Sequence, residues 1–227
     1  MELSQYEEQY KNKNGDILDI EDDYVFPLVK SSSFKDYIIK DDFKKYVIVT
    51  QKKVREDTSL IKNKAPKTWN YLSLHKPLFE KRKSSIYVGA PDFSMFGVGD
   101  YSYSKYKVGI SGFYKKPIFS LVFNENNLEK PVMFDDTSYF LSFDNYEDAY
   151  ACMLLFNSEL VQRFLLTISF QDSKRPYTKK VLQRLSLSKC VNVIKYSDLK
   201  KTEKDLKVDN ILTEDMYGKF KNNIPLG

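Results

Sequence analysis

The spacing of apolar residues predicts a strand-rich middle and a helical end. Short apolar segments separated by Gly, Pro or Asn follow one another from residue 107 to residue 143: KVGISGFY, PIFSLVF, PVMFDD and TSYFLSF. Such segments, rich in β-branched and aromatic residues, are typical of β-strands. Two earlier strands are predicted at Tyr37–Lys40 and Tyr46–Thr50. The segment ENNLEK (125–130) is interpreted as a hairpin connection.

Helical spacing takes over after residue 143. Asp144 and Glu147 have the spacing of a capping box, and apolar residues recur at helical intervals behind them. The pair Asn157-Ser158 is predicted to end this helix and to begin a second one over 160–168. Thr178 is predicted to open a third. Upstream, Asp57-Thr58 can cap a short helix, and Pro66 predicts the first turn of another, which Pro77 should kink or divide.

The remaining segments give weaker patterns. Residues 1–35 are polar and are expected to form loops with one short element, and KCVNVIKY (189–196) is interpreted as a returning strand. The polar, Lys-rich segment from Ser197 predicts disorder or a peripheral helix. These patterns together predict an α+β fold, with a mostly antiparallel sheet or an irregular β-barrel-like core flanked by several short helices. We expect an N-terminal extension at 1–36, a central domain at 37–195 and a tail at 196–227.

Composition indicates a soluble globular protein. Of the 227 residues, 42% are hydrophobic and 30% are charged, and no apolar run approaches the roughly 18 residues of a membrane span. The N-terminal MELSQYEEQYKN is polar, unlike a signal peptide. We therefore expect a cytoplasmic protein without a membrane partner. Cys152 and Cys190 lie far apart in sequence and are interpreted as free thiols.

Charge is distributed unevenly along the chain. Residues 52–116 contain 14 Lys and Arg against five Asp and Glu, whereas residues 117–159 contain one lysine against eight acids. A basic segment folded onto one face attracts polyanions. The alternative is an ordinary solvated surface rich in lysine.

Sequence motifs for catalysis are weak. Gly97 and Gly99 lack the third glycine and the helix of a dinucleotide fingerprint, and no P-loop follows. His75 stands alone, without a neighbouring cysteine or a second histidine. Asp135 and Asp136 could hold a divalent metal, or they could simply stabilise a turn, which we favour. No catalytic or metal-binding residue is assigned.

The basic stretch has the residue types that bind nucleic acid. Lys and Arg neutralise phosphates, Ser and Tyr hydroxyls bond phosphate oxygens, and glycines let backbone amides approach. Asp, Asn, Arg and Ser can read base edges.

Several segments, in their order along the chain, resemble one family. They are LFEKRKSSIY, PDFSMFGVGDYSYSKYKVGISGFYKKPIFSLV, KPVMFDDTSYF, LLFNSELVQRFL and FQDSKRPYTKKVLQRL, with IEDDYVFPLVKSS and APKTW upstream. Together they resemble the C-terminal, TaqI-like specificity domain of bacterial adenine-specific DNA methyltransferases from Type II restriction-modification systems. The resemblance covers roughly residues 17–187, and GVGDYSYSKYKV with DSKRPYT carries most of it. The catalytic tetrapeptide and the Gly-rich cofactor loop of such enzymes do not occur in this sequence.

The resemblance implies a target-recognition module at 37–195. It would bind duplex DNA and position a methyltransferase or a nuclease located on another domain or subunit. S-adenosylmethionine is implied for that methyltransferase domain, and no cofactor is implied for this chain. The candidate DNA-binding residues are Lys81, Arg82, Lys83, Ser84, Ser85, Gly97, Gly99, Asp100, Tyr101, Ser102, Tyr103, Lys105, Lys107, Tyr114, Lys115, Lys116, Lys174 and Arg175.

The sequence allows three alternatives. Asp172 could pair with Lys174 and Arg175 inside the protein, which would remove both cations from an interface. A metal-dependent nuclease using Asp135 or Asp136 is one alternative function. A protein-interaction subunit whose basic face meets an acidic partner is another.

Overall fold

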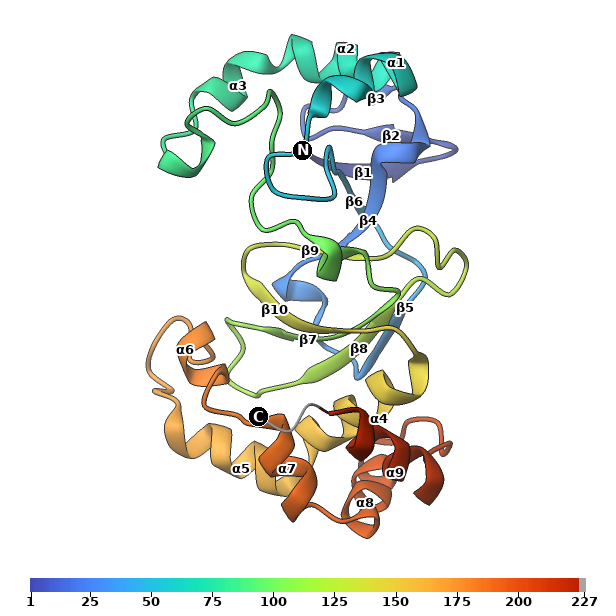
Figure 1. The fold of residues 1–227 in the computed structure, drawn as a ribbon, viewed down its shortest axis with the longest axis vertical. Coiled ribbons are helices and arrows are strands. Elements are labelled where there is room, and N and C mark those ends of the chain that lie inside the picture. The colour runs from blue at the N-terminus through green and yellow to red at the C-terminus, as the bar shows by residue number, and fades with distance from the viewer. Residues whose placement is uncertain (225–227) are drawn as a thin grey trace. The chain divides into compact units, whose positions relative to one another are not determined.

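The computed structural model describes residues 1–224, which form two compact units, each built from separate stretches of the chain (Figure 1). The first unit comprises Met1–Leu28, Asp42–Tyr103 and Lys130–Met133. The second comprises Val29–Asp41, Ser104–Glu129 and the chain from Phe134 onward. The predicted α+β class is confirmed: helices accompany two mostly antiparallel sheets, and neither sheet closes into a barrel within the described residues. The functional division at residues 36 and 195 stays a prediction.

A six-stranded sheet in the order β3-β2-β1-β6-β4-β9 lies in the first unit, except for the last residues of β4 and β9, Val29 and Phe134, which belong to the second. Its strands are β1 (Glu2–Tyr6), β2 (Gln9–Lys11), β3 (Ile17–Leu18), β4 (Val25–Val29), β6 (Lys45–Ile48) and β9 (Met133–Phe134). The expectation of loops over residues 1–35 is therefore wrong. In β1 only Leu3 is buried, so the strand has no apolar run to reveal it.

Three short helices belong to the first unit: α1 (Ile61–Lys64), α2 (Pro66–Leu74) and α3 (Lys76–Glu80). Pro66 occupies the first turn of α2, and the chain breaks at His75 before α3, as predicted from Pro77. Asp57 accepts a hydrogen bond from the Ser59 N–H, which confirms the predicted cap. Tyr71 and Leu72 of α2 belong to the same buried cluster as β1, β4 and β6.

The second unit contains a four-stranded sheet in the order β10-β7-β8-β5. The strands are β5 (Ile38–Lys40), β7 (Tyr106–Ser111), β8 (Phe119–Phe123) and β10 (Ser138–Phe143), close to the predicted segments. Among the described strands of this sheet, β5 alone pairs in parallel, with β8. The hairpin interpretation of ENNLEK is wrong, because it joins β8 to β9, which belongs to the other sheet. Which strands pair depends on which apolar faces pack together, and a turn motif in the sequence does not determine this.

Helix α4 (Tyr146–Asn157) packs on this sheet, and it contacts α5 (Glu159–Ile168), α8 (Tyr196–Leu206) and α9 (Glu214–Asn223) as well (Figure 1). Val108, Ile110 and Leu121 point to this core, whereas Lys107 and Gly109 alternate to the opposite face. Ser158 separates α4 from α5 (Glu159–Ile168), as predicted. The cap is Asn145, whose side chain accepts from the Asp148 N–H at 2.7 Å, one residue later than expected.

Within residues 1–224 no single helix has the length and apolar character to cross a membrane. Helices α4 and α5 reach that length only as a pair bent by 58°.

Four more helices complete the second unit: α6 (Lys179–Leu182), α7 (Leu187–Val193), α8 (Tyr196–Leu206) and α9 (Glu214–Asn223). Thr178 caps α6, as predicted. The strand predicted at 189–196 is wrong, because Ser186 caps α7 and helical spacing places Val191 and Ile194 in the core. Residues 225–227 of the predicted tail lie outside the described residues.

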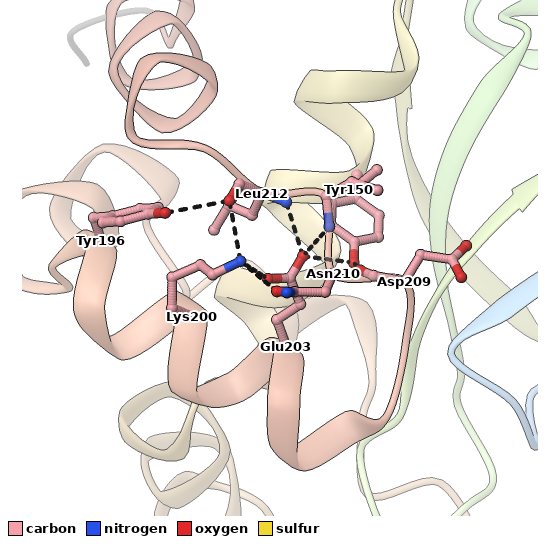
Figure 2. A network of polar contacts seen from close by, with 8 residues as sticks. Tyr150, Tyr196, Lys200, Glu203, Asp209, Asn210 and Leu212 are labelled. Atoms are coloured by element: carbon pink, nitrogen blue, oxygen red, sulfur yellow. Dashed lines mark hydrogen bonds and ion pairs between the residues drawn. The ribbon is translucent and has the colours of Figure 1, made fainter.

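The C-terminal helices are an integral part of the second unit and are not disordered. Glu203 is fully buried and accepts hydrogen bonds from the Tyr150 hydroxyl and from two backbone N–H groups, those of Ile211 and Leu212 (Figure 2). Lys200 also contacts its carboxylate. Because Tyr150 belongs to α4, these bonds fasten the segment between α8 and α9 to the core helix. Burial and the Glu203 hydrogen bond raise the pKa of Tyr150 above its ordinary value.

Candidate nucleic-acid interface

The candidate residues are divided between the two units. Those at 81–85, 97 and 99–103 belong to the first unit, and those at 105, 107, 114–116, 174 and 175 belong to the second.

In the second unit, the turn between β7 and β8 meets the loop that follows α5. The Lys115 ammonium donates hydrogen bonds to the carbonyls of Gln171 and Ser173, the latter at 3.0 Å. The Tyr177 hydroxyl donates to the Lys115 carbonyl at 2.7 Å, and the Tyr177 ring is fully buried. These bonds bring together two segments that are more than 50 residues apart in sequence.

This junction positions the predicted cations of both segments. The Arg175 guanidinium lies 4.6 Å from the centre of the Phe113 ring, and the Lys174 ammonium lies 5.9 Å from it. Both cations are exposed, and within residues 1–224 neither forms an ion pair with Asp172 or another acid. The described part of the chain therefore does not contain the internal ion pair of Asp172 with Lys174 and Arg175. We call Lys115, Lys116, Lys174 and Arg175 the hairpin patch.

Two further lysines next to this patch were missed. Lys179 and Lys180 are exposed at the start of α6, two and three residues after the buried Tyr177. The run of basic residues KRPYTKK was a signal that could have identified them. Tyr114 is half-buried, and Lys116 lies close to the Tyr37 hydroxyl, 3.4 Å away.

The other two candidate lysines of the second unit have internal partners. Lys105 forms an ion pair with Glu129 at 2.9 Å, which raises the pKa of Lys105. Lys107 is 1% exposed and donates to the Ser104 carbonyl at 2.7 Å, while its ammonium lies 5.8 Å from the centre of the Phe140 ring. Burial lowers the pKa of Lys107 to about 7. We therefore leave Lys107 out of the interface proposed below.

In the first unit, Arg82 is an internal clamp between loops. Its guanidinium donates to the carbonyls of Phe79 and Ser94 and lies 3.7 Å from the centre of the Tyr87 ring. The neighbouring candidates point outward: Lys81, Lys83, Ser84 and Ser85 are exposed. A cavity of about 240 Å³ lies beside this segment, lined by Arg82, Lys83 and Tyr87 among others.

The segment from Met95 to Tyr103, which we call the glycine loop, covers one side of the first sheet. Val98 is buried in a cluster with Phe26, Val47 and Val49, and Tyr103 packs against the same cluster. The Tyr103 hydroxyl donates to the Gln51 carbonyl at 3.0 Å, and burial raises the pKa of this hydroxyl.

A tight turn closes the glycine loop. The Ser102 N–H donates to the Gly99 carbonyl at 2.8 Å, and the Ser102 hydroxyl accepts from the Gly99 N–H. Ser102 and Tyr103 therefore shape the loop, and Gly97, Asp100 and Tyr101 are the candidates exposed on it.

Asp135 stabilises a turn, as the sequence interpretation favoured. Its carboxylate accepts hydrogen bonds from the Thr137 hydroxyl at 2.7 Å, from the Thr137 N–H and from the Ser138 hydroxyl at 2.8 Å. Among residues 1–224 there is no group of three or more His, Cys, Asp or Glu side chains able to hold a metal ion. Both cysteines are free, as predicted, and Cys152 is buried.

Comparison with known proteins identifies a relative. No protein-family model matches the chain. The chain is 43% identical over 197 residues to the Type II methyltransferase M.NspV of Nostoc sp., a match that covers 86% of this chain and 40% of the relative. The chain thus spans less than half the length of the curated relative that it matches. This degree of identity over most of the chain shows that the protein is related to a Type II methyltransferase.

Proposed function

We propose that this chain is a duplex-DNA recognition module of a bacterial restriction-modification methyltransferase. It would bind the DNA backbone, read base edges and position an adenine methyltransferase located on another domain or subunit. The relation to M.NspV and the resemblance of residues 17–187 to TaqI-like specificity domains support this proposal. The observation that carries it is the hairpin patch, in which cations from two distant segments are held at one place without acidic partners among the described residues.

The hairpin patch is suited to phosphate binding. The Arg175 guanidinium is pre-oriented by the Phe113 ring, so less side-chain entropy is lost when it bonds to a phosphate. Lys115 uses its ammonium to hold the two loops together, so we assign it mainly to shaping the patch. Lys116 and Lys174 add positive charge, which supplies affinity but no sequence specificity.

Base reading is assigned to exposed polar residues of the first unit. Asp100 can accept a hydrogen bond from a cytosine amino group, and Ser84 and Ser85 can bond several base edges. Lys81 and Lys83, exposed on either side of the internal Arg82, would contact phosphates.

The methyl transfer itself would take place on the partner domain. A target adenine must leave the stack before it can react, and a firmly held duplex makes that step less costly. S-adenosylmethionine supplies the methyl group in such enzymes. The residues of this chain do not fit a dinucleotide-type cofactor loop, because a 3₁₀ turn and strand β7 follow Gly97 and Gly99, where such a loop needs a helix. A module that acts on bacterial DNA would work in the cytoplasm.

The test is the salt dependence of DNA binding. Replacing Lys174 and Arg175 with Ala should weaken binding to all duplexes and reduce the slope of log K against log salt by about two, one for each lost phosphate contact. The matched control is Lys204→Ala with Lys221→Ala. It removes two exposed charges, one of which also lies over an aromatic ring, that of Tyr217. Equal slopes for the two double variants would remove the hairpin patch from the interface.

A further inference from the structure

One aromatic side chain of the first unit combines a rigid backbone with exposure to solvent. Phe96 is 67% exposed, although its neighbours on both sides are anchored. Burying a phenylalanine ring stabilises a protein by roughly 1.5–3 kcal/mol relative to leaving it in water. Most of the Phe96 side chain stays in water after folding, so most of this stabilisation is not gained.

The residue before Phe96 is fixed by a buried glutamine. The Gln51 side-chain amide donates to the Met95 carbonyl at 3.2 Å, and its side-chain oxygen accepts from the Met95 N–H at 3.1 Å. Gln51 is only 4% exposed. This pair of bonds imitates a strand pairing and holds the backbone immediately before Phe96.

The residues after Phe96 are fixed as well. Gly97 has φ +76°, a left-handed conformation that reverses the chain direction at little cost only for glycine. Val98 then inserts into the cluster on the sheet. Phe96 therefore lies at the tip of a short bend whose backbone is held by contacts on both sides, and its ring is exposed.

A second exposed ring depends on Gly99. A Cβ atom at this position would lie 2.8 Å from the edge of the Tyr101 ring, so glycine lets that ring keep its present position without shifting. Tyr101 is 49% exposed. The glycine loop thus presents two aromatic side chains to solvent.

The two residues that anchor this bend, Arg82 and Gln51, both have exposed lysines next to them in the sequence. Arg82 bonds to the Ser94 carbonyl, two residues before Phe96, and its chain neighbours Lys81 and Lys83 are exposed. Gln51, the other anchor, is followed by the exposed Lys52 and Lys53. A ligand that combines negative charge with flat apolar faces would complement both features, and a nucleic acid has this combination.

We propose that Phe96 is a nucleobase-stacking residue, whose ring packs against a base face in DNA bound to the first unit. The proposal rests on the proposed function and adds an aromatic contact to the cationic and polar ones. Because every base has a flat face, this contact contributes affinity for distorted or unpaired DNA and little sequence preference. Because the backbone on both sides of Phe96 is already held, little conformational entropy of the loop is lost on binding.

The experiment compares three variants by fluorescence anisotropy on a duplex and on the same duplex with one unpaired base. Phe96→Ala should lose about tenfold in affinity for the duplex with the unpaired base, which is what one lost stacking contact predicts. Phe96→Trp should retain affinity, and its tryptophan fluorescence should be quenched on binding. The control Leu74→Ala removes an 81% exposed side chain of the same unit and should leave affinity unchanged.

The outcomes separate the two proposals. If the wild-type chain binds neither duplex, the proposed function fails. If it binds both and Phe96→Ala binds as tightly as Leu74→Ala, with no quenching of Trp at position 96, the stacking proposal fails and the proposed function stands. Because Phe96 is mostly exposed, loss of folding is not expected, and circular dichroism of each variant checks this.

Discussion

Replacing Lys107 with Met should change how stability depends on pH. Lys107 is fully buried in the second unit, with one hydrogen bond, to the Ser104 carbonyl, and no ion pair among the described residues. Methionine has a similar length without the charge, so it fills the same space beside Phe140. The comparison between the two proteins therefore isolates the cost of one buried ammonium group.

The magnitude follows from the pKa shift of Lys107. Burial lowers its pKa from 10.5 in the unfolded chain to about 7 in the folded protein. Between these values the unfolded chain binds more protons, so the free energy of unfolding rises as pH increases from 7 to 10.5 and is flat below 7. At 1.36 kcal/mol per pKa unit, burial of Lys107 lowers the free energy of unfolding by about 5 kcal/mol below pH 7. About 3 kcal/mol of it should be regained between pH 7 and pH 9.5.

The assay is urea unfolding of the wild-type protein and Lys107→Met at pH 7, 8.5 and 9.5. The stability of the wild type relative to the variant should increase steadily with pH, since other titrating groups are common to both proteins. A constant difference across this range would refute the buried position of Lys107. The variant should also keep the wild-type salt slope for DNA binding, since the buried ammonium is not assigned to a phosphate.

Three further outcomes concern the second unit. Gly109→Ala should destabilise it by about 1–3 kcal/mol, because the new Cβ would lie 2.3 Å from the Phe134 ring; unchanged thermal unfolding would argue against this packing. Glu203→Ala should cost about 3 kcal/mol or more, since the Tyr150 hydroxyl and two backbone N–H groups lose their acceptor, whereas Glu203→Gln should cost less. Burial raises the pKa of the Cys152 thiol, so site-resolved alkylation near pH 8 should modify it only on unfolding, and fast labelling of native protein would contradict its burial.

Much of the fold could be predicted because local signals agreed with tertiary packing. The strands of the second sheet are short apolar segments between turn residues, and the Thr178 side chain caps α6 as predicted. Ser158 precedes α5 as predicted, although its hydroxyl donates to the Leu155 carbonyl and does not cap the helix. The errors occur where local pattern and packing differ. β1 is a polar strand with one buried residue, Leu3, and the β-branched run of α7 is helical because its buried positions suit helical spacing.

The sequence named candidate residues for the site, and it could not give their geometry. Basic and aromatic composition pointed to residues 81–116, and the motif DSKRPYT pointed to Lys174 and Arg175. The meeting of the two segments through Lys115 is a tertiary contact that no local pattern encodes. Composition also could not show that the ammonium of Lys107 is buried, because strand alternation fixes its face only once the sheet is known.

The central claim is tested most directly by binding the protein to a pool of random DNA duplexes at two salt concentrations and sequencing the bound fraction. A recognition module should enrich one short motif, and that enrichment should persist at the higher salt, where contacts to phosphates alone are weakened. Binding that shows no enrichment and disappears at the higher salt would contradict a target-recognition role for this chain.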